Sequence, residues 1–143
     1  MFTFTLVMNP WDRMVSFYLY RKKRGNLPDE VSFRDYILQF NSPRYKRAKS
    51  LHSLPFYYYG LAEYILDKND KIIVDFVGKY ESRETDIKTI SQRLDCPSLG
   101  HLCLQKAKPL EMHYSQFYDE ETKNIVGRVF AQDIELFGYR FES

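Results

Sequence analysis

FTFTLV (residues 2–7) and MNPWDRMVS (residues 8–16) are the two consecutive segments that decide the fold of this chain. In the first segment aromatic and β-branched residues alternate with a period of two, which is typical of a β-strand. The Asn-Pro pair then breaks the strand pattern, with Asn9 suited to be an N-cap and Pro10 suited to the first helical position. The sequence therefore predicts a strand that runs directly into a helix from Pro10 to about Lys23, ending near Gly25.

The start of this predicted helix suits an anion. Its first backbone N–H groups are unpaired, and the positive end of the helix dipole lies there, so a phosphate is a natural ligand. Asp12, three residues after Asn9, is expected to complete a capping-box-like arrangement. Ser16 lies about two turns into the helix, where its hydroxyl adds a further ligand. From these residues alone, an ordinary capped helix of an α/β domain remains the alternative.

Residues 9–18 resemble a known signature, R-N-P-x-D-R-x-V-S-x-Y, which binds the 3′-phosphate in the sulfotransferases that use 3′-phosphoadenosine-5′-phosphosulfate (PAPS). The similarity is greatest to the branch that includes the carbohydrate sulfotransferases and many small bacterial relatives. Residues 75–81 and 85–87 resemble the strand-to-helix turn of that family. Segments 113–122, 133–134 and 137–141 resemble its C-terminal helix and closing strand-like segment. Three motifs in the right order make a chance resemblance improbable.

The resemblance implies an α/β fold of the P-loop-like sulfotransferase type, with a parallel sheet flanked by helices. It implies transfer of a sulfuryl group from PAPS to a hydroxyl, often on a carbohydrate acceptor. Nucleotide contacts are expected from Asn9, Pro10, Arg13 and Ser16, and Tyr80 is expected to lie against the adenine. We nominate no catalytic base, because none of the three histidines, His52, His101 and His113, matches the base of the family.

Two departures from the family pattern affect the expected activity. The family's leading Arg is replaced by Met8, which can neither carry charge nor donate a hydrogen bond, so weak binding of PAPS and of its product PAP is expected. The 5′-phosphosulfate loop and the usual base precede this point in the family. We therefore expect a partial domain, with the N-terminal βα unit missing, no sulfation by these 143 residues alone, and self-association through the uncovered strand.

Two other functions stay open: an inactive PAP-binding or vestigial module, and a basic nucleic-acid-binding module. The second would use the basic runs 21–24 and 44–49 with the aromatic run 56–59. Residues 1–50 contain ten Lys or Arg against four Asp or Glu, whereas residues 51–143 contain eleven against fifteen. A basic half fits a nucleotide or an acidic polysaccharide as well as nucleic acid, so we favour the nucleotide and do not expect nucleic acid.

Composition sets the remaining bounds. A length of 143 residues with 44% hydrophobic residues predicts one domain with a genuine core. Neither a long apolar stretch nor a signal-peptide pattern is present, so we expect a bacterial cytoplasmic protein with no membrane contact, or a fragment of a Golgi-lumenal animal protein. Cys96, His101 and Cys103 offer only three ligands without zinc-site spacing, so no metal is expected.

The rest of the chain gives weaker signals. Ser32 and Asp35 form a capping box for a short helix that buries Phe33, Tyr36, Ile37 and Phe40. Residues 41–55 are expected to be a loop. Segments 64–67 and 72–77 are strand candidates, the second lying in a parallel sheet beside residues 2–7. A helix is expected from Thr85 or Asp86 to about Leu94, and a last helix from Asp119 to Gly138.

Overall fold

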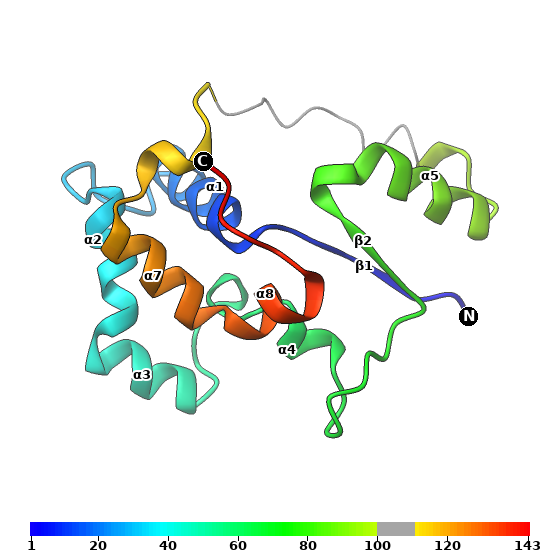
Figure 1. Ribbon diagram of the computed structural model, residues 1–143, viewed down its shortest axis with the longest axis horizontal. Helices are drawn as coiled ribbons and strands as arrows, with labels where there is room; N and C mark the ends of the chain where they lie inside the picture. The colour runs from blue at the N-terminus through cyan, green and yellow to red at the C-terminus, as the bar shows by residue number, and fades with distance from the viewer. Residues whose placement is uncertain (100–110) are drawn as a thin grey trace.

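The computed structural model describes residues 1–99 and 111–143. Two short parallel strands, β1 and β2, lie beside a larger group of helices (Figure 1). This arrangement confirms a mixed α/β fold with a small parallel sheet flanked by helices. The elements are β1 (Phe4–Val7), α1 (Pro10–Lys23), α2 (Phe33–Leu38), η1 (Gln39–Asn41), α3 (Pro43–Ser50), η2 (Phe56–Tyr58), α4 (Ala62–Ile65), β2 (Phe76–Lys79), η3 (Tyr80–Ser82), α5 (Arg83–Arg93), η4 (Tyr114–Phe117), α7 (Glu120–Val129) and α8 (Ala131–Phe137), where η marks a 3₁₀ turn.

The junction between β1 and α1 forms as the sequence predicts. The Asn9 side-chain oxygen accepts the N–H of Trp11 at 3.0 Å, and Pro10 is the first helical residue. Past the other end of α1, Gly25 has a φ of +67°, a conformation that costs glycine little. The expected capping box is wrong, however, because the Asn9 backbone N–H donates to Glu81 at 2.6 Å and not to Asp12.

The strands pair in parallel with Phe4 opposite Phe76 and Leu6 opposite Gly78. On one face of this sheet, Val7 packs with residues of α4 and α8. On the other face α5 packs closely on β2, because a Cβ added at Gly78 would lie 2.7 Å from the Leu6 side chain and 3.1 Å from the Cβ of Asp86. Glycine at this position therefore lets the helix and the strands approach each other.

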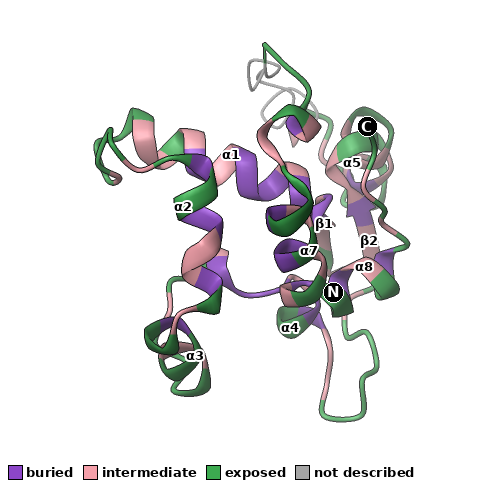
Figure 2. Ribbon diagram, turned by 60° about the vertical axis from the view of Figure 1, so that its left-hand side comes forward, coloured by how far each residue is buried: buried purple, intermediate pink, exposed green. Residues whose placement is uncertain are grey.

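The main hydrophobic core lies between α1, α2 and α7, where buried residues occupy the facing sides of the helices (Figure 2). The capping box of α2 is confirmed, since Ser32 and Asp35 bond reciprocally as expected. The fully buried side chains at the centre of the main core are Met14, Val15, Tyr36, Ile37, Val126 and Phe130. One face of α1 is packed in this core. The opposite face, which carries Asp12 and Ser16, is left open.

Two sequence predictions about the middle of the chain are wrong. Residues 41–55 are not all loop, because Ser42 caps the N–H of Tyr45 at 3.1 Å and Pro43 opens the helix α3. Residues 64–67 form the end of the helix α4 and a single antiparallel bridge between Leu66 and Ile72, not a strand. The regular part of the second strand is accordingly shorter and later, at residues 76–79.

The C-terminal helical region differs in detail from the prediction. Asp119 caps α7 with a reciprocal capping box to Thr122, as an N-terminal start at Asp119 predicts. The helix does not continue to Gly138 without interruption, because Phe130 leaves the helical conformation and separates α7 from α8. Gly138 then ends α8 with a φ of +68°. The helix α5 begins at Arg83, two residues before the expected start.

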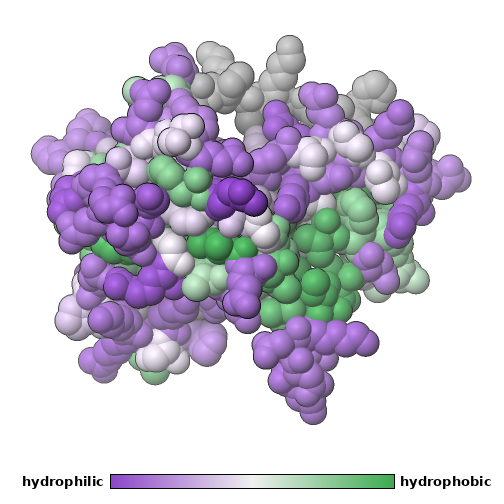
Figure 3. All heavy atoms as spheres, in the orientation of Figure 1, coloured by the Kyte–Doolittle hydropathy of each residue, from purple (hydrophilic) through white to green (hydrophobic). Residues whose placement is uncertain are grey.

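One face of the molecule is apolar where the strands and the segment before β2 lie (Figure 3). Ile73 is 60% exposed and Phe4 is 40% exposed on this part of the chain. Within residues 1–99 and 111–143, no helix combines the length and the apolar character that a membrane span requires.

Candidate functional site

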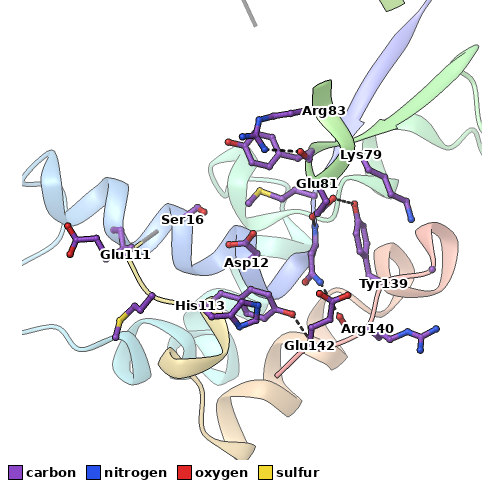
Figure 4. A pocket seen from close by; sticks show the side chains of 17 residues that line it. Asp12, Ser16, Lys79, Glu81, Arg83, Glu111, His113, Tyr139, Arg140 and Glu142 are labelled. Atoms are coloured by element: carbon purple, nitrogen blue, oxygen red, sulfur yellow. Dashed lines mark hydrogen bonds between the residues drawn. The ribbon is translucent and has the colours of Figure 1, made fainter. Parts of the chain in front are cut away.

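A cavity of about 880 Å³ opens at the C-terminal ends of both strands, where β1 enters α1 and β2 enters η3 (Figure 4). Ligands of open parallel sheets commonly bind at this edge. Its wall comes from four parts of the chain: the β1–α1 turn, residues 79–83, residues 111–114 and the C-terminal segment, residues 138–143. Segments distant in sequence therefore build one cavity around the start of α1.

Three positions of the signature, Met8, Asn9 and Ser16, line this cavity together with Tyr80 of the strand-to-helix motif. Asp12 lies between Asn9 and Ser16, and the spacing of these three residues places them on one helix face. Pro10 is not among the lining residues and acts as the first residue of α1. The signature thus supplies both a cavity face and a structural start for the helix.

Arg13 lies on the other side of α1, away from the cavity. Its guanidinium is buried 3.7 Å from the Asp133 carboxylate and donates to the carbonyl of Tyr59 at 3.1 Å. It also lies 4.8 Å from the centre of the Phe130 ring. Burial lowers the pKa of Arg13, and Asp133 opposes that effect. These contacts give Arg13 a structural role in joining α1 to α8 and to the segment before α4.

Asn9 faces the cavity, but its side chain is used within the protein. The oxygen accepts from Trp11, and the amide nitrogen donates to the carbonyl of Arg140 at 3.0 Å. One side chain therefore caps α1 and fixes the C-terminal segment against it. Asn9 shapes the cavity wall by this double contact.

Glu81 is a site residue that the sequence analysis did not nominate. One carboxylate oxygen accepts the Asn9 N–H at 2.6 Å, and the other accepts the Tyr139 hydroxyl at 3.0 Å. Glu81 thereby connects the end of β2, the start of α1 and the C-terminal segment. The signal was present, because Tyr80-Glu81 closes the strand-to-helix motif at residues 75–81.

Two basic side chains of the cavity, Arg83 and Lys79, are held against aromatic rings. The Arg83 guanidinium lies 4.6 Å from the Tyr80 ring centre and donates to the Tyr80 carbonyl at 3.2 Å. Lys79 donates to the carbonyl of Phe137 at 2.7 Å and lies 4.9 Å from the Tyr139 ring centre. Cations placed over rings in this way leave a flat ring and a positive charge side by side.

Acidic side chains balance these cations. The lining includes four carboxylates, those of Asp12, Glu81, Glu111 and Glu142. Burial raises the pKa of Asp12, the nearby Glu81 raises it further, and His113 opposes both effects. The cavity therefore has no uniform positive field, and Asp12 is the carboxylate whose charge its surroundings favour least.

The C-terminal segment forms one wall and is firmly attached. The Phe141 ring packs edge-on against Trp11 with ring centres 5.6 Å apart, and the Glu142 N–H donates to the Tyr114 hydroxyl at 2.7 Å. His113 lies beside this wall, and its Nδ1 is 2.8 Å from the Ser115 hydroxyl. These contacts hold residues 113–114 and the C-terminal segment together over the start of α1 (Figure 4).

No metal site can be assigned among residues 1–99 and 111–143, where no group of three or more His, Cys, Asp or Glu is arranged to hold an ion. His101 and Cys103, which the sequence analysis considered with Cys96, lie outside the described residues.

Residues 1–140 match the model of the Sulfotransferase family. The chain belongs to this family. A protein of Archaeoglobus fulgidus, described as uncharacterized, is 32% identical over 100 residues, which cover 66% of this chain and 68% of that relative. No solved structure gives a significant match. The chemistry that the family assignment indicates is sulfuryl transfer. The matched residues include every part of the cavity wall up to Arg140.

Proposed function

We propose that the cavity binds the 3′-phosphoadenosine part of PAPS and that the protein transfers the sulfuryl group to a carbohydrate hydroxyl. The observation that carries the proposal is the position of Ser16. Its hydroxyl lies on the cavity face of α1, in the segment that resembles the 3′-phosphate signature and lies within the family match. The start of α1 beside it adds the positive end of a helix dipole.

The residues of the cavity fit a nucleotide. A volume of about 880 Å³ is that of a typical small-molecule site. Tyr80, backed by the guanidinium of Arg83, offers a flat ring for the adenine. Arg83 and Lys79 supply positive charge near the phosphates. Met8, in place of the family's Arg, lowers the expected affinity without obstructing this arrangement.

Each residue has a separate task in the proposed site. PAPS supplies an activated sulfuryl group attached to a good leaving group. Ser16 donates a hydrogen bond to the 3′-phosphate, Tyr80 stacks on the base, and Arg83 offsets negative charge. Asn9 and Glu81 hold the start of α1 and the C-terminal segment in place, so that the wall excludes water. No described residue is nominated as the base that takes the acceptor proton.

Met8→Arg tests this proposal directly. The new guanidinium should restore a charge-assisted bond to the 3′-phosphate and tighten PAP binding by about 1.5–3 kcal/mol, roughly ten- to a hundred-fold. Ser16→Ala should weaken binding. Calorimetric titration with PAP and with adenosine 5′-phosphate, which has no 3′-phosphate, measures both effects.

The controls separate a local contact from a general gain in charge. Ser50→Ala, at the end of α3, removes a hydroxyl outside the cavity and should leave PAP affinity unchanged. The gain from Met8→Arg should be smaller for adenosine 5′-phosphate and should decrease with added salt. Equal gains for the two nucleotides, or no gain for PAP, would show that the start of α1 is not the 3′-phosphate site.

Met8 also favours a second candidate function, a module that binds PAP without turnover. PAP stabilises the protein under both candidates, so the melting temperature alone does not separate them. Sulfated product formed from PAPS by the purified chain would refute this second candidate, because a module without turnover forms none.

A further inference from the structure

A second pocket lies next to the nucleotide cavity and shares Ser16 with it. Its volume is about 660 Å³, and the rest of its lining consists of Phe17, Tyr20, Arg21, Asn26, Phe56 and Tyr57. We call it the aromatic pocket. The two pockets meet at the residue that the proposed function assigns to the 3′-phosphate. A ligand that fills both pockets must therefore continue from the nucleotide through that phosphate.

The aromatic pocket keeps large rings accessible to solvent. Phe56 is 68% exposed and Tyr20 is 53% exposed, although both border a concave surface. Phe17 supports the far side, with its ring centre 6.4 Å from that of Phe56 and 5.4 Å from that of Tyr57. Exposed rings held by packed neighbours form a fixed stacking surface for a flat ligand group, with little entropy left to lose on binding.

The spacing along α1 fits one nucleoside beyond the phosphate. Ser16 and Tyr20 are four residues apart, so they lie on the same helix face, about 6 Å apart along the helix axis. Asn9 and Asp12 of the nucleotide cavity precede them on this face. A ribose separates a phosphate from the next base by a comparable length. A second base therefore reaches the aromatic rings when the phosphate lies at Ser16.

Arg21 is fixed in place at the side of these rings. One terminal nitrogen donates to the Tyr58 hydroxyl at 2.8 Å, and the other donates to the carbonyl of Asn26 at 3.1 Å. Its guanidinium lies 5.7 Å from the Tyr57 ring centre. No carboxylate within residues 1–99 and 111–143 makes an ion pair with Arg21, so its charge is available to an anionic ligand.

The charges on the other side of Ser16 favour a phosphodiester over a terminal phosphate. A terminal phosphate carries about 1.5 to 2 negative charges at neutral pH, whereas a diester carries one. Met8 supplies no cation, and the carboxylate of Asp12 lines the same cavity as Ser16. A ligand with a single charge is repelled less by this carboxylate and loses less from the absence of a cation at residue 8.

We propose that the aromatic pocket binds a second nucleoside, joined to the adenosine through the 3′-phosphate. The inference rests on the proposed function, since it places the 3′-phosphate at Ser16, and it extends the ligand class to 3′-phosphodiesters of adenosine 5′-phosphate. The second base stacks on Phe56 or Tyr20, and Arg21 offsets the charge of the diester. A free dinucleotide and the 5′ end of a single strand both offer this chemistry.

Three ligands test the proposal on the full chain by calorimetric titration. They are PAP, the methyl ester of its 3′-phosphate, and the dinucleotide pApA, in which a second adenosine replaces the methyl group. The dinucleotide should bind about five-fold or more tightly than the methyl ester, as expected for one base stacked on an aromatic ring. The methyl ester should bind with an affinity close to that of PAP, because it differs only in charge and in one small group.

Variants assign the effect to named residues. Tyr20→Ala combined with Phe56→Ala should lower the affinity for pApA to that of the methyl ester, with the affinity for PAP unchanged. Ser16→Ala should weaken all three ligands alike. Leu51→Ala removes another exposed apolar side chain, one that lines neither pocket, and should change none of the affinities. The melting temperature of each variant checks its folding.

The outcomes separate this proposal from the nucleotide site. Equal affinity for pApA and the methyl ester, or a gain that survives the loss of both rings, would overturn the second nucleoside site and leave PAP bound. A methyl ester that fails to bind while PAP binds would overturn it too, because the phosphate site would then be closed. Failure of all three ligands to bind would refute the nucleotide site itself.

A longer strand with the same 5′ end distinguishes the two sources of the ligand. The hexanucleotide of adenosine with a 5′-phosphate is titrated beside pApA. Equal affinities support the second nucleoside site with a free dinucleotide as its ligand. A higher affinity of the hexanucleotide, lost with the two ring substitutions, supports the same site with the 5′ end of a strand as its ligand. A higher affinity that persists in that variant would overturn the aromatic pocket as the place where the strand binds.

Discussion

The two sides of α1 differ in how far their polar side chains are buried. On the core side, Arg13 and Asp133 are 5% and 1% exposed, and the Asp133 oxygens also accept the N–H groups of Leu61 and Ala62 at 2.8 and 2.9 Å. On the cavity side, Asp12 and Ser16 belong to a wall open to about 880 Å³ of space. The charges of the first cluster are paired within the protein, and the second cluster is available to a ligand.

This contrast shows that a residue's place in a signature does not by itself define its role. Arg13 carries the charge expected of a phosphate ligand, yet its guanidinium is buried against Asp133 of α8 and donates to the carbonyl of Tyr59 before α4. Asn9 reaches the cavity, but both polar atoms of its side chain are used to cap α1 and hold the C-terminal segment. Ser16 of the signature and Tyr80 of the strand-to-helix motif are the residues best placed to meet a ligand.

The largest effect is expected from Asp133→Ala. The substitution leaves the buried Arg13 charge without its partner and removes the acceptor for two N–H groups at the start of α4. The free energy of unfolding should fall by about 3–5 kcal/mol. Urea denaturation measures the change, with Glu135→Ala on the exposed side of α8 as control. An equal, small loss in both variants would show that the Arg13 cluster is not a structural centre.

An intermediate effect is expected from Asp12→Asn. At neutral pH the substitution removes a negative charge beside the proposed phosphate site and should tighten PAP binding roughly three- to ten-fold, or about 1 kcal/mol. Because the pKa of Asp12 is raised, this difference should be complete well above that pKa and should vanish as the pH falls through it and the wild-type carboxyl takes up a proton.

The difference between the two proteins is the quantity to measure, because the phosphate of PAP also titrates. Calorimetric titrations of wild type and Asp12→Asn at several pH values give it directly. Glu30→Gln, an exposed carboxylate outside the cavity, should bind PAP as the wild type does at every pH. A constant difference between wild type and Asp12→Asn across the pH range would place Asp12 away from the bound phosphate.

The smallest effect is expected from Arg34→Gln. Arg34 pairs with Asp119 and Glu121, as Arg13 pairs with Asp133, but all three side chains of this surface cluster are about half exposed. Water replaces the lost partners at little cost, and salt screens the pair. Urea denaturation at low and high salt should show a slight loss at low salt and none at high salt. A loss comparable with that of Asp133→Ala would mean that pairing, and not burial, decides the cost.

The sequence was sufficient for features with a local cause. The N-cap at Asn9, the bounds of α1, the cap at Ser32 and the start of a helix at Asp119 were all predicted, because each depends on residues within one turn. The parallel pairing of the two strands also followed from their apolar pattern. Ser42 and Pro43 could have predicted α3, since they are a cap and a first-turn residue in the correct order.

The remaining features depend on contacts between distant residues. The segment 64–67 has strand-like residues, but the Asp133 carboxylate, 71 residues beyond Ala62, accepts the N–H groups that start α4. The replacement of Asp12 by Glu81 at the Asn9 N–H likewise spans 72 residues. Neither partner could be identified from local spacing, although the motif that ends in Glu81 was recognised.

The hydrogen bond from Asn9 to the carbonyl of Arg140 joins residues that are 131 positions apart. The cavity therefore lacks a wall during synthesis until residue 140 has left the ribosome. Contacts of such long sequence separation form slowly. Until they form, β1 and α1 keep apolar surface exposed to solvent. A tag fused to Ser143 would lie two residues from Phe141, whose ring packs on Trp11. For production of the protein, the other end of the chain is the safer place for a purification tag.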